Sequence, residues 1–208
     1  MTHWNDTRLK LLYDHYKDTF SINRGRERSR DILFYLVVLL FGVLLLELGH
    51  PDNFTSILTE FEFQGAKLHL SNIPYGTIIS VTWTLILMTA MRYCQISTHI
   101  EKQYKYLHKI EEKICSIIGE DDVFSREGKS YFENYPLFSE WTWFFYTGIF
   151  PVIIIIAALF ALHIEWNFLD MPLYHQLFDT VIGFVILTTF MLYRTIPQIL
   201  KKISRAYF

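Results

Sequence analysis

The sequence predicts an all-α integral membrane protein with four transmembrane helices and with both termini in the cytosol. Hydrophobic residues make up 51% of the 208 residues and are concentrated in four long blocks rather than in an alternating pattern. Each block is long enough to cross a bilayer as a helix. Because a backbone inside lipid must satisfy its own hydrogen bonds, a helix is the expected conformation of each block.

The four expected spans are residues 32–48, 73–93, 144–163 and 178–197. The second span is the richest in Ser and Thr, and Pro151 is expected to kink the third. Buried helices of a soluble protein are the alternative, which four such blocks in a chain of 208 residues disfavour. No cleavable signal peptide is expected, because the residues before the first block are strongly charged.

Basic residues predict the topology. Of the 19 Lys and Arg residues, Lys67 alone lies between the first two spans, and none lies between the third and fourth. The positive-inside rule therefore places both termini and the central segment in the cytosol. The expected parts are a cytosolic amphipathic helix (1–31), a first transmembrane hairpin (32–93) with its outer loop (49–72), a cytosolic helical segment (94–142), a second transmembrane hairpin (143–197) and a cytosolic tail (198–208).

Two cytosolic helices are expected. In residues 3–31, apolar residues recur every four positions, which indicates an amphipathic helix that runs into the first span. The second span is expected to continue as one helix to about Gly119, because its apolar residues follow heptad spacing. This seam packs either on the N-terminal helix of the same chain or against other copies as an oligomer seam. Its members are Ile96, Ile100, Gln103, Leu107, Ile110, Ile114 and Ile117.

Basic side chains of the cytosolic segments are candidates for binding a phosphate-bearing ligand, a nucleotide or an oligonucleotide, because Arg pairs with phosphate through two hydrogen bonds. Contact with lipid headgroups is the simpler interpretation of the arginine run 24–30. Residues 128–130 resemble the end of a phosphate loop, but the glycine and strand that should precede them are missing. The candidate ligand-binding residues are Arg24, Arg26, Arg28, Arg30, Lys105, Lys109, Arg126 and Lys129.

Polar residues near the span ends and inside the spans permit several interpretations. The outer loop alternates around Gln64-Gly65, which predicts a small β-hairpin over 61–70. Scattered interfacial side chains are the preferred interpretation of Glu47, His50, His163, Glu165, His175 and Asp179, and a metal or pH site is the alternative. The second span presents a polar face that either joins helices or lines a pore. The candidate pore-lining residues are Thr77, Ser80, Thr84 and Met88.

The sequence contains no nucleophile motif, no paired carboxylates at mid-membrane and no metal-ligand set, so we expect no enzymatic activity, no metal and no cofactor. Two hypotheses remain. The first is a homo-oligomeric channel, lined by the second span and gated from the cytosol. The second is a membrane-anchored sensor or scaffold that recruits a soluble cytosolic partner. Loss of activity on mutation of Thr77, Ser80 and Thr84 would favour the channel.

The layout resembles that of small membrane effectors of bacterial antiphage operons. The resemblance is carried by the charged helix 11–20, the arginine run before the first span, the four-span body and the mid-chain cytosolic helix. The Hailong-type channel effector is the first comparison, and the membrane subunit of Kiwa-type systems is the second. The resemblance implies a multi-pass protein of the bacterial inner membrane, oligomerisation, an operon-encoded partner and membrane depolarisation that halts infected cells.

Overall fold

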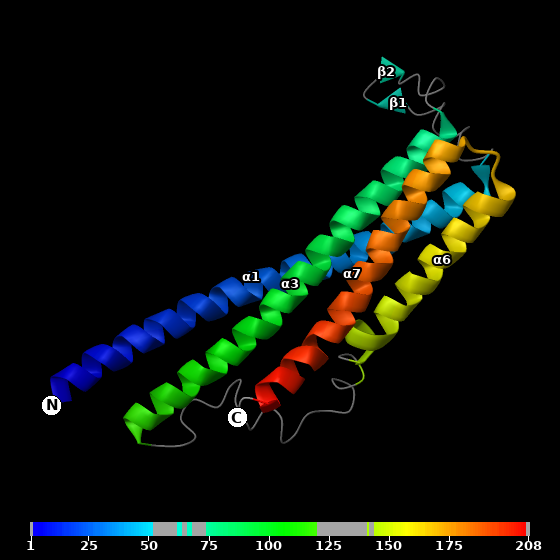
Figure 1. Ribbon diagram of the computed structural model, residues 1–208. Coiled ribbons are helices and arrows are strands. Elements are labelled where there is room, and N and C mark those ends of the chain that lie inside the picture. The colour runs from blue at the N-terminus through cyan, green and yellow to red at the C-terminus, as the bar shows by residue number, and fades with distance from the viewer. Residues whose placement is uncertain are drawn as a thin grey trace. The chain divides into compact units, whose positions relative to one another are not determined.

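The structure is a computed structural model that describes residues 2–51, 62–63, 66–67, 74–119, 141 and 144–206. Four long helices dominate it: α1 (Thr2–Gly49), α3 (Tyr75–Ile118), α6 (Phe150–Phe168) and α7 (Leu173–Ala206) (Figure 1). Each of them contains a stretch that is long and apolar enough to cross a membrane. The prediction of four membrane-spanning helices is confirmed at this level.

Helices α1 and α3 each run without a break through both a charged and an apolar segment. The prediction that the second span continues as one helix is therefore confirmed. It ends at Gly119, whose backbone φ of 78° lies in the left-handed region that favours glycine at a helix C-terminus. The Gly119 N–H donates to the Cys115 carbonyl at 2.9 Å, which satisfies one of the last carbonyls of the helix.

The third span changes its helical geometry next to Pro151. A π-helical turn, η2 (Phe145–Ile149), precedes α6, and Pro151 lies in the first turn of α6. The first backbone N–H groups of a helix have no intrahelical acceptor, so a proline there removes no hydrogen bond. The expected effect of Pro151 on the third span therefore coincides with a change from π-helical to α-helical geometry at the start of α6.

The predicted hairpin between the first two spans is present as a short ladder. Strand β1 (Glu62–Phe63) pairs antiparallel with β2 (Ala66–Lys67). Glu62 lies opposite Lys67 and Phe63 lies opposite Ala66. The expected turn residues, Gln64 and Gly65, lie outside the described residues.

The chain divides into two compact units: unit 1 contains residues 1–32 and 95–145, and unit 2 contains residues 33–94 and 146–208. In unit 1, part of α1 packs on part of α3 around a buried apolar cluster. Leu107 and Ile114 of α3 are at most 1% exposed there, beside Tyr16 of α1. Leu9, Leu12 and Phe20 of α1 pack on the same cluster. The apolar faces predicted on both helices therefore meet each other.

Three tyrosine hydroxyls join the two helices of unit 1. Tyr16 donates to the buried Glu111 carboxylate at 2.9 Å, and Tyr104 donates to Glu27. His15 Nε2 lies 2.8 Å from the Tyr106 hydroxyl. Each pair links positions 77 or more residues apart, so these contacts fix how the two helices are aligned along their axes.

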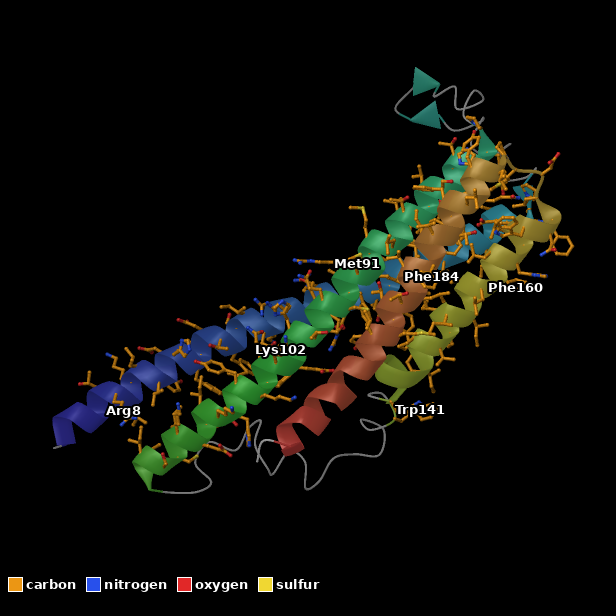
Figure 2. All side chains as sticks on the ribbon, in the orientation of Figure 1. Arg8, Met91, Lys102, Trp141, Phe160 and Phe184 are labelled. Carbon is orange, nitrogen blue, oxygen red and sulfur yellow. The ribbon has the colours of Figure 1, made fainter. Side chains whose placement is uncertain are left out.

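Unit 2 has an apolar exterior, and its largely apolar interior also contains buried acidic side chains. Its exposed side chains include Leu39 at 62% and Phe184 at 68%, and Figure 2 labels Met91, Phe160 and Phe184 on three of its helices. Glu47, Glu165 and Asp179 are at most 1% exposed. An apolar exterior of this extent suits contact with lipid rather than with water.

The two ends of unit 2 have different chemistry. At the end where α6 begins, aromatic rings from all four helices pack together, with Phe34 4.6 Å from Phe150 and 4.9 Å from Tyr146 between ring centroids. Tyr93 is only 1% exposed and packs against Tyr193 in this layer. At the opposite end, residues 169–172 join α6 to α7. We call this the connection end; it contains the buried polar side chains.

The packing of unit 1 generates a stability prediction. Leu107→Ala should destabilise the contact between α1 and α3 by about 2–5 kcal/mol, because it leaves a cavity in a fully buried cluster. Leu11→Ala is the matched control, since Leu11 lies on α1 and is 72% exposed. Hydrogen exchange of residues 9–20 measures the effect. Equal protection in both variants would contradict the packing described above.

Candidate functional site: a buried polar cluster in unit 2

The connection end of unit 2 gathers polar side chains from four helices. Glu47 comes from the end of α1, Ser80 from the start of α3, Glu165 from the end of α6 and Asp179 from the second turn of α7. Each of them is less than 9% exposed. Asp179 lies six residues after Leu173, which is about 9 Å along the axis of α7. The cluster therefore extends into the bundle.

A serine hydroxyl bridges an acid and a histidine at the centre of this cluster. Ser80 Oγ donates to Asp179 Oδ2 at 3.1 Å and lies 3.0 Å from His175 Nδ1. His175 and Asp179 are one helical turn apart on α7, so both side chains point toward the same side of α3. The three residues form what we call the Asp179–Ser80–His175 bridge.

The two glutamates of the cluster each accept a hydrogen bond from a neutral donor on α3. Thr82 Oγ1 donates to Glu47 Oε1 at 3.1 Å, and the Trp83 indole N–H donates to Glu165 Oε1. The Gln176 side-chain amide donates to the Glu165 backbone carbonyl at 3.1 Å. Consecutive residues of one helix, Thr82 and Trp83, thus hold carboxylates of two different helices.

Each acid of the cluster also keeps an atom with no hydrogen-bond partner among the described residues. These atoms are Glu47 Oε2, Glu165 Oε2 and Asp179 Oδ1, together with His175 Nε2. No described Lys or Arg forms an ion pair with them. A buried carboxylate without a cationic partner is costly in an apolar interior. Apolar packing alone therefore does not explain why these acids are buried.

Glycine at two positions allows the helices around the cluster to approach closely. A Cβ on Gly76 would lie 2.8 Å from Cδ2 of the His175 ring, and a Cβ on Gly183 would lie 2.9 Å from Cδ1 of Leu162. Small residues permit this approach between membrane helices. Gly76 thus seats the His175 ring beside Ser80.

The arrangement limits the chemistry of the cluster. A serine hydrolase places its histidine between the serine and the acid, whereas here the serine lies between the acid and the histidine. Among the described residues, no three His, Cys, Asp or Glu side chains are placed to hold a metal ion together. The bridge is suited instead to holding and passing a proton, because a hydroxyl both donates and accepts a hydrogen bond.

The interpretation of the connection-end residues as scattered interfacial groups is wrong for four of the six. Glu47, Glu165, His175 and Asp179 are buried and face the interior of unit 2, whereas His50 and His163 are exposed. The interior is the favourable place for them because lipid offers no hydrogen bonds. The sequence did contain a signal for this cluster: Glu47, Glu165 and Asp179 each lie within two helical turns of the expected outer end of a span.

The four candidate pore-lining residues do not share one environment. Ser80 belongs to the bridge, and the Thr84 hydroxyl donates to the Ser80 backbone carbonyl at 2.8 Å. Thr77 is half-buried and Met88 is 65% exposed. Ser80 therefore faces the interior of its own bundle, and Met88 faces outward.

Six of the eight candidate ligand-binding residues lie on the described helices of unit 1; Arg126 and Lys129 lie outside the described residues. On α1, Arg24 and Arg28 are exposed and Arg26 is half-buried. Arg30 is bound to Asp31 at 2.8 Å. On α3, Lys105 and Lys109 are exposed. Arg24 and Arg28 are one turn apart, as are the two lysines, so each pair shares one face of its helix. Figure 2 labels Arg8 and Lys102 on the same two helices.

The predicted seam residues face the inside of unit 1. Ile96, Ile100, Leu107, Ile110 and Ile114 are buried, and Gln103 and Ile117 are half-buried. Leu107, Ile110 and Ile114 contact α1 of the same chain. An oligomer that used these three residues as its seam would have to displace the N-terminal helix.

Comparison of this chain with protein families, with characterised proteins and with solved structures finds no match.

The close approach at Gly76 makes a testable prediction. Gly76→Ala should lower the melting temperature in detergent by about 2–8 °C, because the added methyl pushes the His175 ring out of the bridge. Gly42→Ala, at a helical position with nothing within 4 Å of the new Cβ, should leave the melting temperature unchanged or raise it. A Gly76→Ala variant as stable as the Gly42→Ala variant would exclude the tight seat for His175.

Proposed function

We propose that this chain is the subunit of an oligomeric membrane channel gated from its cytosolic side. The observation that carries the proposal is the continuity of α1 and α3, which each contribute one segment to unit 1 and another to unit 2. A ligand that changes the packing of the unit 1 segments acts on the same two helices that help to enclose the polar cluster. Differential affinity for the closed and open states then gates the channel.

The buried cluster supports this proposal over a purely structural role for the spans. A membrane anchor needs apolar helices only. Three buried acids destabilise an apolar bundle, so an anchoring role alone does not explain their presence. Ionisable groups inside membrane bundles commonly mark ion or proton pathways. The acids Glu47, Glu165 and Asp179 occupy that position here.

The gating ligand in this proposal carries phosphate. The exposed pair Arg24 and Arg28 and the exposed pair Lys105 and Lys109 lie on the two helices of unit 1. Arginine binds phosphate through two parallel hydrogen bonds, and lysine adds charge. A nucleotide or an oligonucleotide of the cytosol fits this chemistry.

A membrane-anchored sensor or scaffold is the second candidate, and one observation favours it. Ser80, expected to line a pore, hydrogen-bonds to Asp179 within its own bundle. In this alternative the helix pair of unit 1 is the docking surface for a soluble partner, and the spans hold it at the membrane.

In either case we propose a bacterial inner membrane protein of an antiphage system. The support for this setting is the resemblance in layout described above. Opening of such a channel would depolarise the membrane of an infected cell and stop its growth.

Ion flux tests the channel directly. Purified protein, freed of bound nucleic acid and nucleotides, is placed in liposomes that contain a potential-sensitive dye. Thr84→Leu should lower the flux about tenfold, equivalent to about 1.4 kcal/mol in barrier height, because a larger apolar side chain obstructs and dewets a pore. Thr89→Leu is the control. Its hydroxyl also donates to a backbone carbonyl of α3, but it lies about 140° around the helix.

Either result of the flux measurement is decisive. Flux in the wild type and in Thr89→Leu, but not in Thr84→Leu, supports the channel. Liposomes that stay tight with ligand-free wild-type protein, and also after addition of the oligonucleotide, reject the channel and favour the scaffold.

Binding of a labelled single-stranded DNA oligonucleotide tests the ligand surface. Replacing both Arg24 and Arg28 by Gln should weaken binding and reduce the slope of log K against log salt by about 1.4, because two phosphate contacts are lost. The double variant Lys10→Gln, Lys17→Gln removes the same charge from exposed positions of α1 outside the arginine run. Equal weakening by both double variants would indicate a nonspecific charge effect and not a site.

A further inference from the structure

The bridge at the connection end can hold one proton in two ways. In the first, Asp179 is ionised, Ser80 donates its hydroxyl hydrogen to Asp179 Oδ2, and a doubly protonated His175 donates from Nδ1 to Ser80 Oγ. In the second, the Nδ1 proton has moved to Ser80 Oγ while the hydroxyl proton of Ser80 has moved to Asp179 Oδ2. The same heavy-atom distances, 3.0 and 3.1 Å, serve both arrangements, because a hydroxyl can donate and accept at once.

One proton makes this bridge electrically neutral. In the first arrangement a positive imidazolium and a negative carboxylate balance, and in the second both groups are uncharged. Without that proton the bridge carries one negative charge at Asp179, which is 0% exposed. No described Lys or Arg forms an ion pair with it. Such a charge is expensive inside an apolar bundle.

We propose that the Asp179–Ser80–His175 bridge is a proton-binding site that exchanges with the solution at the connection end of unit 2. The site stands by itself, whether or not the chain conducts ions.

His175 Nε2 is the atom at which the proton enters and leaves. His175 is the third residue of α7, next to the connection between α6 and α7, and its Nε2 atom is buried, so exchange with the solution takes place when this end of the bundle opens transiently. Nε2 has no hydrogen-bond partner among the described residues. When water takes the Nε2 proton from the first arrangement, His175 keeps its Nδ1 hydrogen and its bond to Ser80, and Asp179 stays ionised. No other bond changes.

The titratable groups around the bridge favour a bound proton. Glu165 of α6 and Asp179 are close enough for their charges to interact. Glu47 of α1 and Tyr75 of α3 lie at the same end, and Tyr75 donates to the Glu47 backbone carbonyl. The described cluster contains several acids and no Lys or Arg, so one proton on the bridge relieves repulsion between its negative charges.

The pH dependence of stability tests this proposal. The proposal is that the native bridge keeps its proton above pH 7, where an unfolded chain has an ionised aspartate and a mostly neutral histidine; the native state then binds one proton more than the unfolded chain. Stability then falls as the pH rises. The melting temperature of the full-length protein in detergent should fall by about 3–5 °C per pH unit between pH 7 and 9, until the bridge loses its proton.

Asp179→Asn should abolish most of this slope, because asparagine needs no proton to be neutral. Ser80→Ala separates the acid from the histidine and should reduce the slope, which provides a second variant if the first does not fold. Asp170→Asn is the matched control, since Asp170 is exposed in the α6–α7 connection, and it should keep the wild-type slope.

Three results would overturn the proposal. The first is a flat wild-type profile between pH 7 and 9, and the second is the same slope in Asp179→Asn as in the wild type. The third is a wild-type melting temperature that responds to sodium or potassium against choline at equal ionic strength and loses that response in Asp179→Asn. That result would identify an alkali-ion site in place of a proton site.

Discussion

The cost of placing a polar group in an apolar interior is the constraint on which the rest of this structure depends. Backbone groups meet it by forming helices that run the length of each apolar block. Threonine hydroxyls reduce this cost by donating to the backbone carbonyl one turn earlier, as Thr84, Thr188 and Thr189 do at 2.8–2.9 Å. The acids cannot meet it alone, so they turn inward, where Thr82, Trp83 and Ser80 each supply a donor. The placement of the acids of unit 2 inside the bundle, away from its apolar exterior, follows from this constraint.

Helix α3 has the central role in both units. Its first turns provide the donors for acids on three other helices, and its last turns provide Leu107, Ile110 and Ile114 for the contact with α1. Tyr16 and Glu111 show the same principle in unit 1, since a buried carboxylate there also accepts from a neutral hydroxyl. An isolated ion pair inside an apolar contact would be costly, and a neutral donor reduces that cost. One helix therefore sets the position of the polar groups in each unit.

The two units have different roles in the function we propose. The exposed basic pairs of unit 1 supply recognition of phosphate, and the interior of unit 2 supplies groups that interact with protons or ions. Because α1 and α3 belong to both units, no separate linker is needed to connect recognition to the membrane. A proton site at the connection end would give the protein a second input, distinct from the cytosolic ligand.

The sequence by itself determined the four helices that are long and apolar enough to cross a membrane, the continuation of α3 to Ile118 before Gly119, and the antiparallel pair of strands β1 and β2. Those features depend on local composition, on heptad spacing and on glycine's conformational freedom, which a sequence displays directly. Only the tertiary structure decided which polar residues face inward. Glu47, Glu165 and Asp179 lie on three different helices, and their distance from a span end does not reveal their direction around the helix. The same applies to Ser80, whose partner could be a pore or a neighbouring helix until α7 brings Asp179 and His175 against it. The direction in which a side chain points depends on how the helices pack. Lipid surrounds the bundle on all sides, so it does not distinguish one outward direction from another.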